Sequence, residues 1–263
     1  MSRLAGFLWW ATAMPLLPLV LPMAVLTRRS ALRLAPAAGP QQGLVGDAYP
    51  GEPLRLLLIG ESTVVGVGAS CLDHALIGRL ASALAKRLER QVAWRACGEN
   101  GITAAGAVER LLPHVQGEAV DLLILVFGVN DTTHFSSART WGESLQALAR
   151  PFSERGSRVV LAGVPPLQYF SALPWLLRLL LGWRARLLDR RLRELAAREG
   201  LGYCATTLEM RAEYLALDGY HPSQRGYEVW AEAMADWFIA SASELSPAQS
   251  LSGSADGNVK AMA

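Results

Sequence analysis

The stretch Leu54-Arg55-Leu56-Leu57-Leu58-Ile59-Gly60-Glu61-Ser62 is a short apolar run that ends in a polar turn. A run this apolar is typical of a parallel strand that is buried on both faces. It is followed by a helical stripe in which a leucine recurs every four residues, at Leu76, Leu80, Leu84 and Leu88. Strand, turn and amphipathic helix are the repeating unit of an α/β fold.

The same alternation continues along the chain. Further apolar runs at 92–97, 122–127 and 159–164, and a short one around Tyr203, predict more strands. Helical stripes fall at Leu187, Leu188, Leu192 and Leu195, and at Tyr227, Trp230, Met234 and Trp237. We therefore predict an α/β fold of three layers, with a central five-stranded parallel sheet in flavodoxin-like strand order.

Length and composition indicate one domain, which we place at residues 54–240 of the 263. The chain has 25 basic and 23 acidic residues, so its net charge gives no argument for nucleic-acid binding. Its cysteines, Cys71, Cys97 and Cys204, form neither a disulfide framework nor a metal-binding spacing. We expect no metal and no organic cofactor.

The N-terminus is of a different kind. Residues 4–27 carry no charge, and basic residues flank them at Arg3, Arg28, Arg29 and Arg33. As a helix this run would be about 36 Å long, enough to cross a hydrocarbon core of about 30 Å. We expect residues 1–34 to be a membrane anchor, and the basic C-terminal flank places the following domain in the cytoplasm. A cleaved signal peptide that exports the protein, and a helix packed on the domain or along a membrane, are the alternatives.

Two segments beside the domain have little apolar character. Residues 35–53 are rich in Pro, Gly, Ala and Gln and predict a linker. Residues 241–263 are rich in Ser, Ala and Gly and predict a disordered tail.

Four short polar stretches carry the chemistry. They are Gly60-Glu61-Ser62, Asn100-Gly101, Gly128-Val129-Asn130-Asp131 and Asp218-Gly219-Tyr220-His221. The first three follow predicted strands, and open α/β sheets bind ligands outside the carboxyl ends of their strands.

Together these stretches contain the parts of a serine esterase. A serine hydroxyl needs a base to take its proton, and His221 can be that base for Ser62. Asp218 lies three residues earlier, close enough to orient the imidazole. The backbone N–H groups of Ser62 and Gly101 and the side-chain amide of Asn130 would stabilise an oxyanion.

The four stretches resemble the sequence blocks of the SGNH or GDSL hydrolases, over roughly residues 54–239. The first block of that family is usually Gly-Asp-Ser, whereas this chain has Glu61 in place of the aspartate. Gly101 matches the glycine of the second block, residues 128–131 match Gly-x-Asn-Asp, and Asp218 and His221 match Asp-x-x-His. The resemblance implies the same fold and the same residue roles.

Each stretch also has a purely structural interpretation. Ser62 alone would more often be a helix N-cap, Gly101 a turn glycine, and Asn130-Asp131 a loop or cap. Asp218 and His221 could cap the last helix. Four such coincidences in the right order favour catalysis instead. The other histidines, His74, His114 and His134, are expected to be surface or loop residues.

The sequence therefore predicts a hydrolase that cleaves acyl or acetyl esters, with lipid-like esters among its candidate substrates, through an acyl-serine intermediate. An acyltransferase that uses the same intermediate and a membrane-tethered binding protein without activity are the alternatives. The apolar stretch 165–183 follows a strand end, so it predicts either a lid or acyl-binding wall, or an ordinary buried helix.

Overall fold

The computed structural model describes residues 2–206 and 211–244. Its centre is a six-stranded sheet in the order β1-β3-β2-β4-β5-β6. The strands are β1 (Gln42–Val45), β2 (Leu54–Gly60), β3 (Val92–Gly98), β4 (Leu122–Val126), β5 (Arg158–Ala162) and β6 (Gly202–Cys204). Strands β2 to β6 are parallel, which confirms the predicted α/β fold and its flavodoxin-like order.

The sixth strand was not predicted. Strand β1 pairs antiparallel with β3 at the edge of the sheet, with Gln42 opposite Arg95 and Val45 opposite Val92. Just before it, the Ala37 N–H donates to the Val65 carbonyl. Part of the segment predicted as a linker, residues 35–53, therefore pairs with the sheet.

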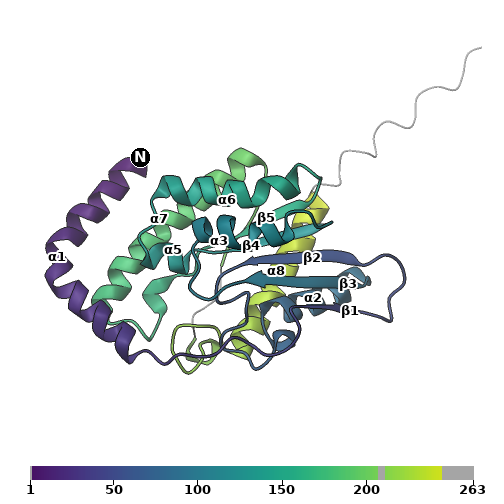
Figure 1. Ribbon diagram of the computed structural model, residues 1–263, viewed down its shortest axis with the longest axis horizontal. Helices are drawn as coiled ribbons and strands as arrows, with labels where there is room; N and C mark the ends of the chain where they lie inside the picture. The colour runs from purple at the N-terminus through teal and green to yellow at the C-terminus, as the bar shows by residue number, and fades with distance from the viewer. Residues whose placement is uncertain (1, 207–210, 245–263) are drawn as a thin grey trace, which may run out of the picture.

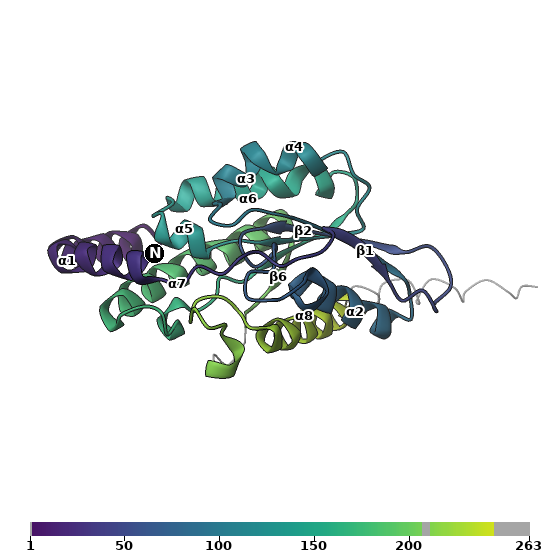
Figure 2. The ribbon, with the colours of Figure 1, turned by 60° about the horizontal axis from the view of Figure 1, so that its bottom comes forward.

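Helices cover both faces of the sheet, so the molecule has three layers (Figure 2). One face carries α3 (Ala104–Arg110), α4 (Leu112–Val115), α6 (Ala138–Ser153) and α7 (Trp175–Glu199). The other carries α2 (Leu76–Leu88) and α8 (Gln224–Glu244). Four shorter helical elements lie in the connecting segments: η1 (Leu72–His74), α5 (Val129–Thr133), η2 (Leu167–Tyr169) and η3 (Ala212–Tyr214).

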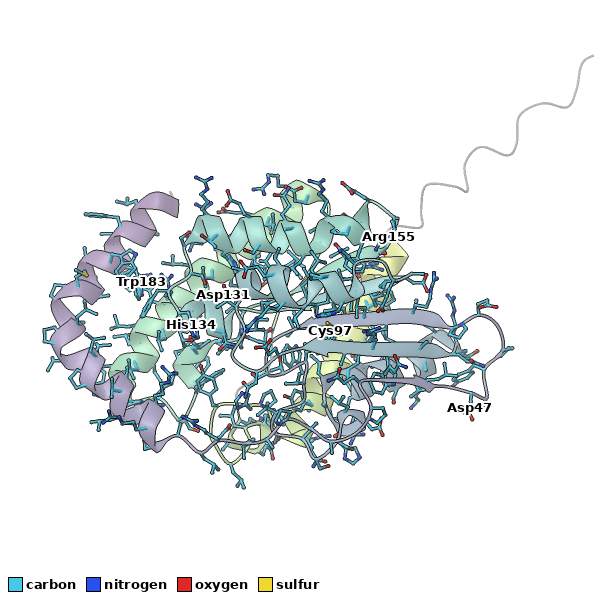
Figure 3. The ribbon with its side chains drawn as sticks, viewed as in Figure 1. Asp47, Cys97, Asp131, His134, Arg155 and Trp183 are labelled. Carbon is cyan, nitrogen blue, oxygen red and sulfur yellow. The ribbon has the colours of Figure 1, made fainter. Side chains whose placement is uncertain are left out.

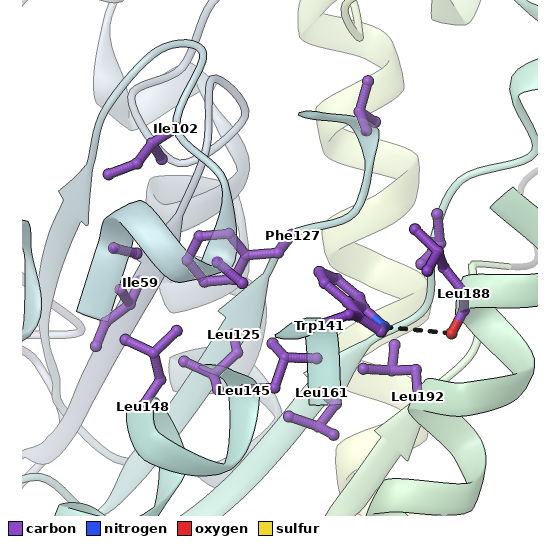
Figure 4. Close-up of a cluster of buried hydrophobic side chains, with 14 of the residues drawn as sticks. Ile59, Ile102, Leu125, Phe127, Trp141, Leu145, Leu148, Leu161, Leu188 and Leu192 are labelled. Carbon is purple, nitrogen blue, oxygen red and sulfur yellow. Dashed lines mark hydrogen bonds between the residues drawn. The ribbon is translucent and has the colours of Figure 1, made fainter. Parts of the chain in front are cut away.

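The core follows from the apolar strands. Strand β4 is buried at every residue, and β2 is buried everywhere except Arg55. The Trp141 side chain of α6 is buried. Its indole N–H donates to the carbonyl of Leu188, on α7, over 3.3 Å (Figure 4). Truncating a buried tryptophan typically costs about 3–5 kcal/mol, so this residue fixes α6 against α7.

The N-terminal run forms one continuous helix, α1 (Ser2–Ser30), that includes Pro15, Pro18 and Pro22. Residues Leu4–Ser30 are long and apolar enough to cross a membrane, with a mean hydropathy of 1.7 over the most apolar window. The helix also lies along α7 (Figure 1). Its single span is compatible with an anchor and with a signal sequence.

The C-terminal boundary differs slightly from the prediction. Helix α8 continues to Glu244, so residues 241–244 belong to it rather than to a tail. The rest of the predicted tail, residues 245–263, lies outside the described part of the chain.

Candidate active site

The candidate site lies beyond the carboxyl ends of β2, β4, β5 and β6. Two glycines allow the chain to turn there. A Cβ on Gly60 would lie 2.3 Å from the Val126 carbonyl oxygen, so only glycine lets β2 end beside β4. Gly128 has a φ of +132°, a conformation that side chains rarely adopt, and it turns β4 into α5.

Asp218 and His221 form a compact pair on the loop before α8. One carboxylate oxygen of Asp218 accepts the backbone N–H groups of Tyr220 and His221 at 2.9 and 3.0 Å. The other lies 2.6 Å from His221 Nδ1. Burial acts to raise the pKa of the Asp218 carboxyl, but the hydrogen bonds from the imidazole and the two backbone groups outweigh it and hold this pKa below its ordinary value.

Ser62 and His221 line the same pocket. Ser62 is in the turn after β2 and is only 7% exposed. No hydrogen bond joins its hydroxyl to the His221 ring in the part of the chain that the structure describes, so the two share the pocket without being bonded. Catalytic hydrogen bonds are often long in unliganded sites and tighten when substrate binds.

Glu61 occupies a buried position that the sequence left without a role. One of its carboxylate oxygens accepts the Val129 N–H at 3.0 Å. The other accepts both the backbone N–H of Asn130, at 2.9 Å, and its side-chain amide, at 2.7 Å. Burial raises the pKa of the Glu61 carboxyl to about 8, although these hydrogen bonds act in the opposite direction.

Asp131 joins the second and third polar stretches. This buried carboxylate accepts the Ala104 N–H at 3.0 Å, at the start of α3, and the Ser136 hydroxyl at 2.6 Å. Gly101 lies three residues before Ala104, is exposed, and has a φ of +86°. Asp131 therefore ties the Gly101 loop to the loop that carries Asn130.

The three predicted oxyanion donors have different surroundings. Within residues 2–206 and 211–244, neither the Ser62 N–H nor the Gly101 N–H donates a hydrogen bond. Asn130 uses one hydrogen of its side-chain amide on Glu61, which leaves the other. Gly101 and Asn130 are not among the residues that line the pocket around Ser62 and His221.

Apolar side chains form much of the pocket wall. Phe170 stands edge-to-face against the Tyr220 ring, with ring centroids 5.0 Å apart, and Tyr220 packs on His221. The lining also includes Val126, Phe127, Val129, Pro165 and Trp230. The apolar stretch 165–183 thus divides: Pro165 and Phe170 face the pocket, whereas Leu176, Leu177, Leu180 and Leu181 are buried on α7.

The remaining histidines lie elsewhere. His134 follows α5, is exposed, and its Nδ1 bonds to the Asn130 carbonyl oxygen over 2.9 Å. It lies near Asp131 in the view of Figure 3. Over the described residues, no group of three or more histidine, cysteine, aspartate or glutamate side chains could hold a metal ion.

The profile of the GDSL-like lipase/acylhydrolase family matches residues 58–229. The chain belongs to this family. The match covers all four polar stretches, and it confirms the resemblance seen in the sequence.

Several solved structures share this fold. A lipase/acylhydrolase from Enterococcus faecalis aligns with a TM-score of 0.55 and 22% identity, covering 72% of this chain and 96% of that one. The esterase EstA from Pseudoalteromonas sp. aligns with a TM-score of 0.58 and 13% identity, over 72% and 98% of the two chains. Est24, a carbohydrate acetylesterase from Sinorhizobium meliloti, aligns with a TM-score of 0.55 and 17% identity, over 71% and 99%. Among curated proteins, none matches this chain by sequence.

Proposed function

We propose that this hydrolase cleaves carboxylic esters through an acyl-serine intermediate, with Ser62, His221 and Asp218 as its catalytic residues. The observation that carries the proposal is that Ser62 and His221 line one pocket while Asp218 holds His221 Nδ1 at 2.6 Å. Because Nδ1 carries its proton toward a carboxylate, Nε2 is left as a proton acceptor.

The reaction follows from these positions. His221 Nε2 takes the Ser62 hydroxyl proton as the serine oxygen attacks the ester carbonyl carbon. The His221 proton then passes to the departing alcohol as the carbon–oxygen bond breaks. Water, deprotonated by His221, attacks the acyl-serine carbonyl carbon. His221 then returns this proton to the Ser62 oxygen as the bond between that oxygen and the acyl group breaks and the carboxylic acid leaves.

The negative charge on the carbonyl oxygen needs donors. The Ser62 and Gly101 N–H groups are unused within the described chain, and Asn130 has one amide hydrogen to spare. These three groups are the donors we propose for the oxyanion. Removing one such donor typically costs about 2.7–4 kcal/mol of transition-state stabilisation.

The apolar pocket wall supports acyl esters as substrates.

We further propose that α1 stays on the mature protein as a membrane anchor, with the catalytic domain on the cytoplasmic side, because Arg28, Arg29 and Arg33 follow the apolar run. Mass spectrometry of the mature N-terminus tests retention. A chain that begins near residue 38 in the soluble fraction would instead identify α1 as a signal peptide.

Labelling with a fluorophosphonate tests the reaction class, since this reagent reacts with an activated serine. We expect one label per chain, on Ser62, in the full-length protein. Ser62→Ala and His221→Ala should abolish labelling and hydrolysis, and the double variant should be little worse than either single one because the residues act as a unit. Failure of the folded wild-type protein to react would favour a non-catalytic binding protein.

A further inference from the structure

Helix α1 has two different faces. One forms a seam in which Trp9 and Ala13 are buried with Leu176 and Leu180 of α7, and Val20 and Met23 pack behind them. Outside this seam the helix is apolar and exposed, as at Phe7, Leu19 and Leu26. An anchor that served only to attach the domain would not need such a seam.

Trp9 is the most buried residue of that seam, with 2% of its surface exposed. Its indole N–H donates to the Leu180 carbonyl over 2.9 Å. Trp183, one turn further along α7, lies on the side that faces α1 (Figure 3). The contact therefore has a defined geometry as well as a buried surface.

Trp9 also covers a buried cation. The guanidinium carbon of Arg184 lies 4.9 Å from the Trp9 ring, 5.4 Å from Phe135 and 6.0 Å from Trp10. Arg184 is only 7% exposed, and burial lowers the pKa of its guanidinium while Asp131 acts in the opposite direction. We call Trp9, Trp10, Phe135 and Arg184 the arginine cage. Two of its three rings come from α1.

The cage continues into the Asn130 loop. Arg184 donates to the Ser136 carbonyl over 2.7 Å, and the Ser136 hydroxyl and N–H in turn donate to Asp131. Phe135 has a φ of +57°, which a bulky residue adopts only when its surroundings impose it. Its ring contacts with Trp9 and Trp10, at 5.9 and 6.0 Å, are such surroundings.

Asp131 is the point where this chain of contacts reaches the site. It follows Asn130 directly, and its carboxylate holds the Ala104 N–H just after the Gly101 loop. A shift of Ser136 would therefore act on both loops that carry the outer oxyanion donors.

We propose that α1 is a positioning element for the oxyanion site, acting through the arginine cage on the loops of Asn130 and Gly101. This inference rests on the proposed ester hydrolysis. Trp9, Trp10 and Arg184 are positioning residues, since none of them lines the pocket. The enzyme then works fully only with α1 seated on α7, so α1 would hold the protein at the membrane by its exposed apolar sides while its seam stays on the domain.

The test uses full-length protein in detergent and a small soluble p-nitrophenyl ester, with active sites counted by burst titration. Trp9→Ala should lower kcat per titrated site by roughly 3- to 30-fold, the range for coupling through intermediate contacts, with little change in KM. Trp10→Ala should give a smaller loss of kcat. Because Trp10 is already 44% exposed, this variant keeps the test valid if Trp9→Ala fails to fold. The matched control is Phe7→Ala, on the same helix but 67% exposed, and it should match wild type.

A double-mutant cycle separates positioning from general stabilisation. In the Asn130→Ala background, Trp9→Ala should cost less activity than it does in wild type, because one of the two donors that it positions is gone. Multiplicative losses, or a normal kcat per site with fewer active sites, would overturn the proposal in favour of a purely structural role.

A second readout is independent of activity. In Ser62→Ala protein, Trp9→Ala should speed amide hydrogen exchange in residues 129–136 and 101–106 but not in β2 or β4. Unchanged exchange in both loops would overturn the proposed coupling, even if the wild-type protein hydrolyses esters. Lack of esterase activity in wild type would contradict the proposed function, and faster exchange would still establish the coupling.

Discussion

The side-chain amide of Asn130 donates a 2.7 Å hydrogen bond to the carboxylate of Glu61. The same carboxylate oxygen accepts the Asn130 backbone N–H, so both ends of the residue are fixed by one acceptor. This arrangement orients the remaining amide hydrogen of Asn130 before any substrate arrives. Donors that are already oriented stabilise a developing charge without reorganising during the reaction.

Glu61→Gln should therefore impair catalysis although it conserves size. Above pH 8, where Glu61 is ionised, the glutamine has one carbonyl oxygen for the three N–H groups that the carboxylate accepts, and its own NH₂ would face another donor. We expect kcat to fall by roughly tenfold or more, yet by less than the 10²–10³ typical of removing a donor itself, with KM little changed. Steady-state kinetics beside the exposed control Glu109→Gln measure this. A raised KM at normal kcat would make Asn130 a substrate contact instead.

Glu61 should also give the protein an unusual pH dependence of stability. Its pKa in the folded protein is about 8, against an ordinary value of 4.5. Between these values the unfolded chain releases the proton first, so the contribution of Glu61 to the free energy of unfolding falls as pH rises. Asp218 behaves oppositely, since its pKa is lowered and its contribution is lost as pH falls below its ordinary 3.8. Urea unfolding from pH 4.5 to 8 should show a decline that is smaller in Glu61→Gln; equal slopes would contradict the assignment.

The sequence predicted the sheet well because buried strands and leucine stripes are local patterns. Strand β1 is different: Gln42-Gly43-Leu44-Val45 is half exposed and becomes a strand only by pairing with β3. The side of α1 that packs on α7 could not be predicted from the sequence, for a related reason. Because residues 4–27 carry no charge on any side of the helix, no polar stripe indicates which side packs.

The same distinction applies to the site. Asp218 and His221 are three residues apart, so their spacing alone predicts the contact. Glu61 and Asn130 are 69 residues apart and meet because β2 and β4 are neighbours in the sheet. The match of Glu61 to the acid of the family's first block was the one signal available for it, and it did not indicate what the carboxylate binds.

Phe170 should limit the length of acyl chain that the pocket accepts. It lies on the pocket wall, is buried, and packs edge-to-face on Tyr220. Phe170→Ala should raise kcat/KM for longer p-nitrophenyl esters relative to the acetate, because the removed ring leaves apolar space. The neighbouring Tyr169→Ala is the matched control, since that side chain is exposed and does not line the pocket. An unchanged chain-length profile in Phe170→Ala would place the acyl group elsewhere.

Two truncations should locate the start of the folded hydrolase domain. Removing residues 1–33 deletes α1 but keeps β1 and the contacts that precede it. Removing residues 1–45 also deletes β1, together with the Gln41 carbonyl that accepts the Ala96 N–H at 2.8 Å. The longer truncation uncovers Trp94, whose ring lies against Gly43, and leaves β3 as an unprotected edge strand.

We therefore expect the truncation at residue 45 to melt lower than the truncation at residue 33. Several lost hydrogen bonds at about 1 kcal/mol each correspond to a difference of about 6–12 °C in a domain of this size. Both proteins lack α1, so comparing them removes the effect of the arginine cage. Differential scanning fluorimetry and the soluble yield of each protein decide the matter. Equal melting temperatures would mean that residues 34–45 add no stability and that the domain begins at Leu54, as the sequence predicted.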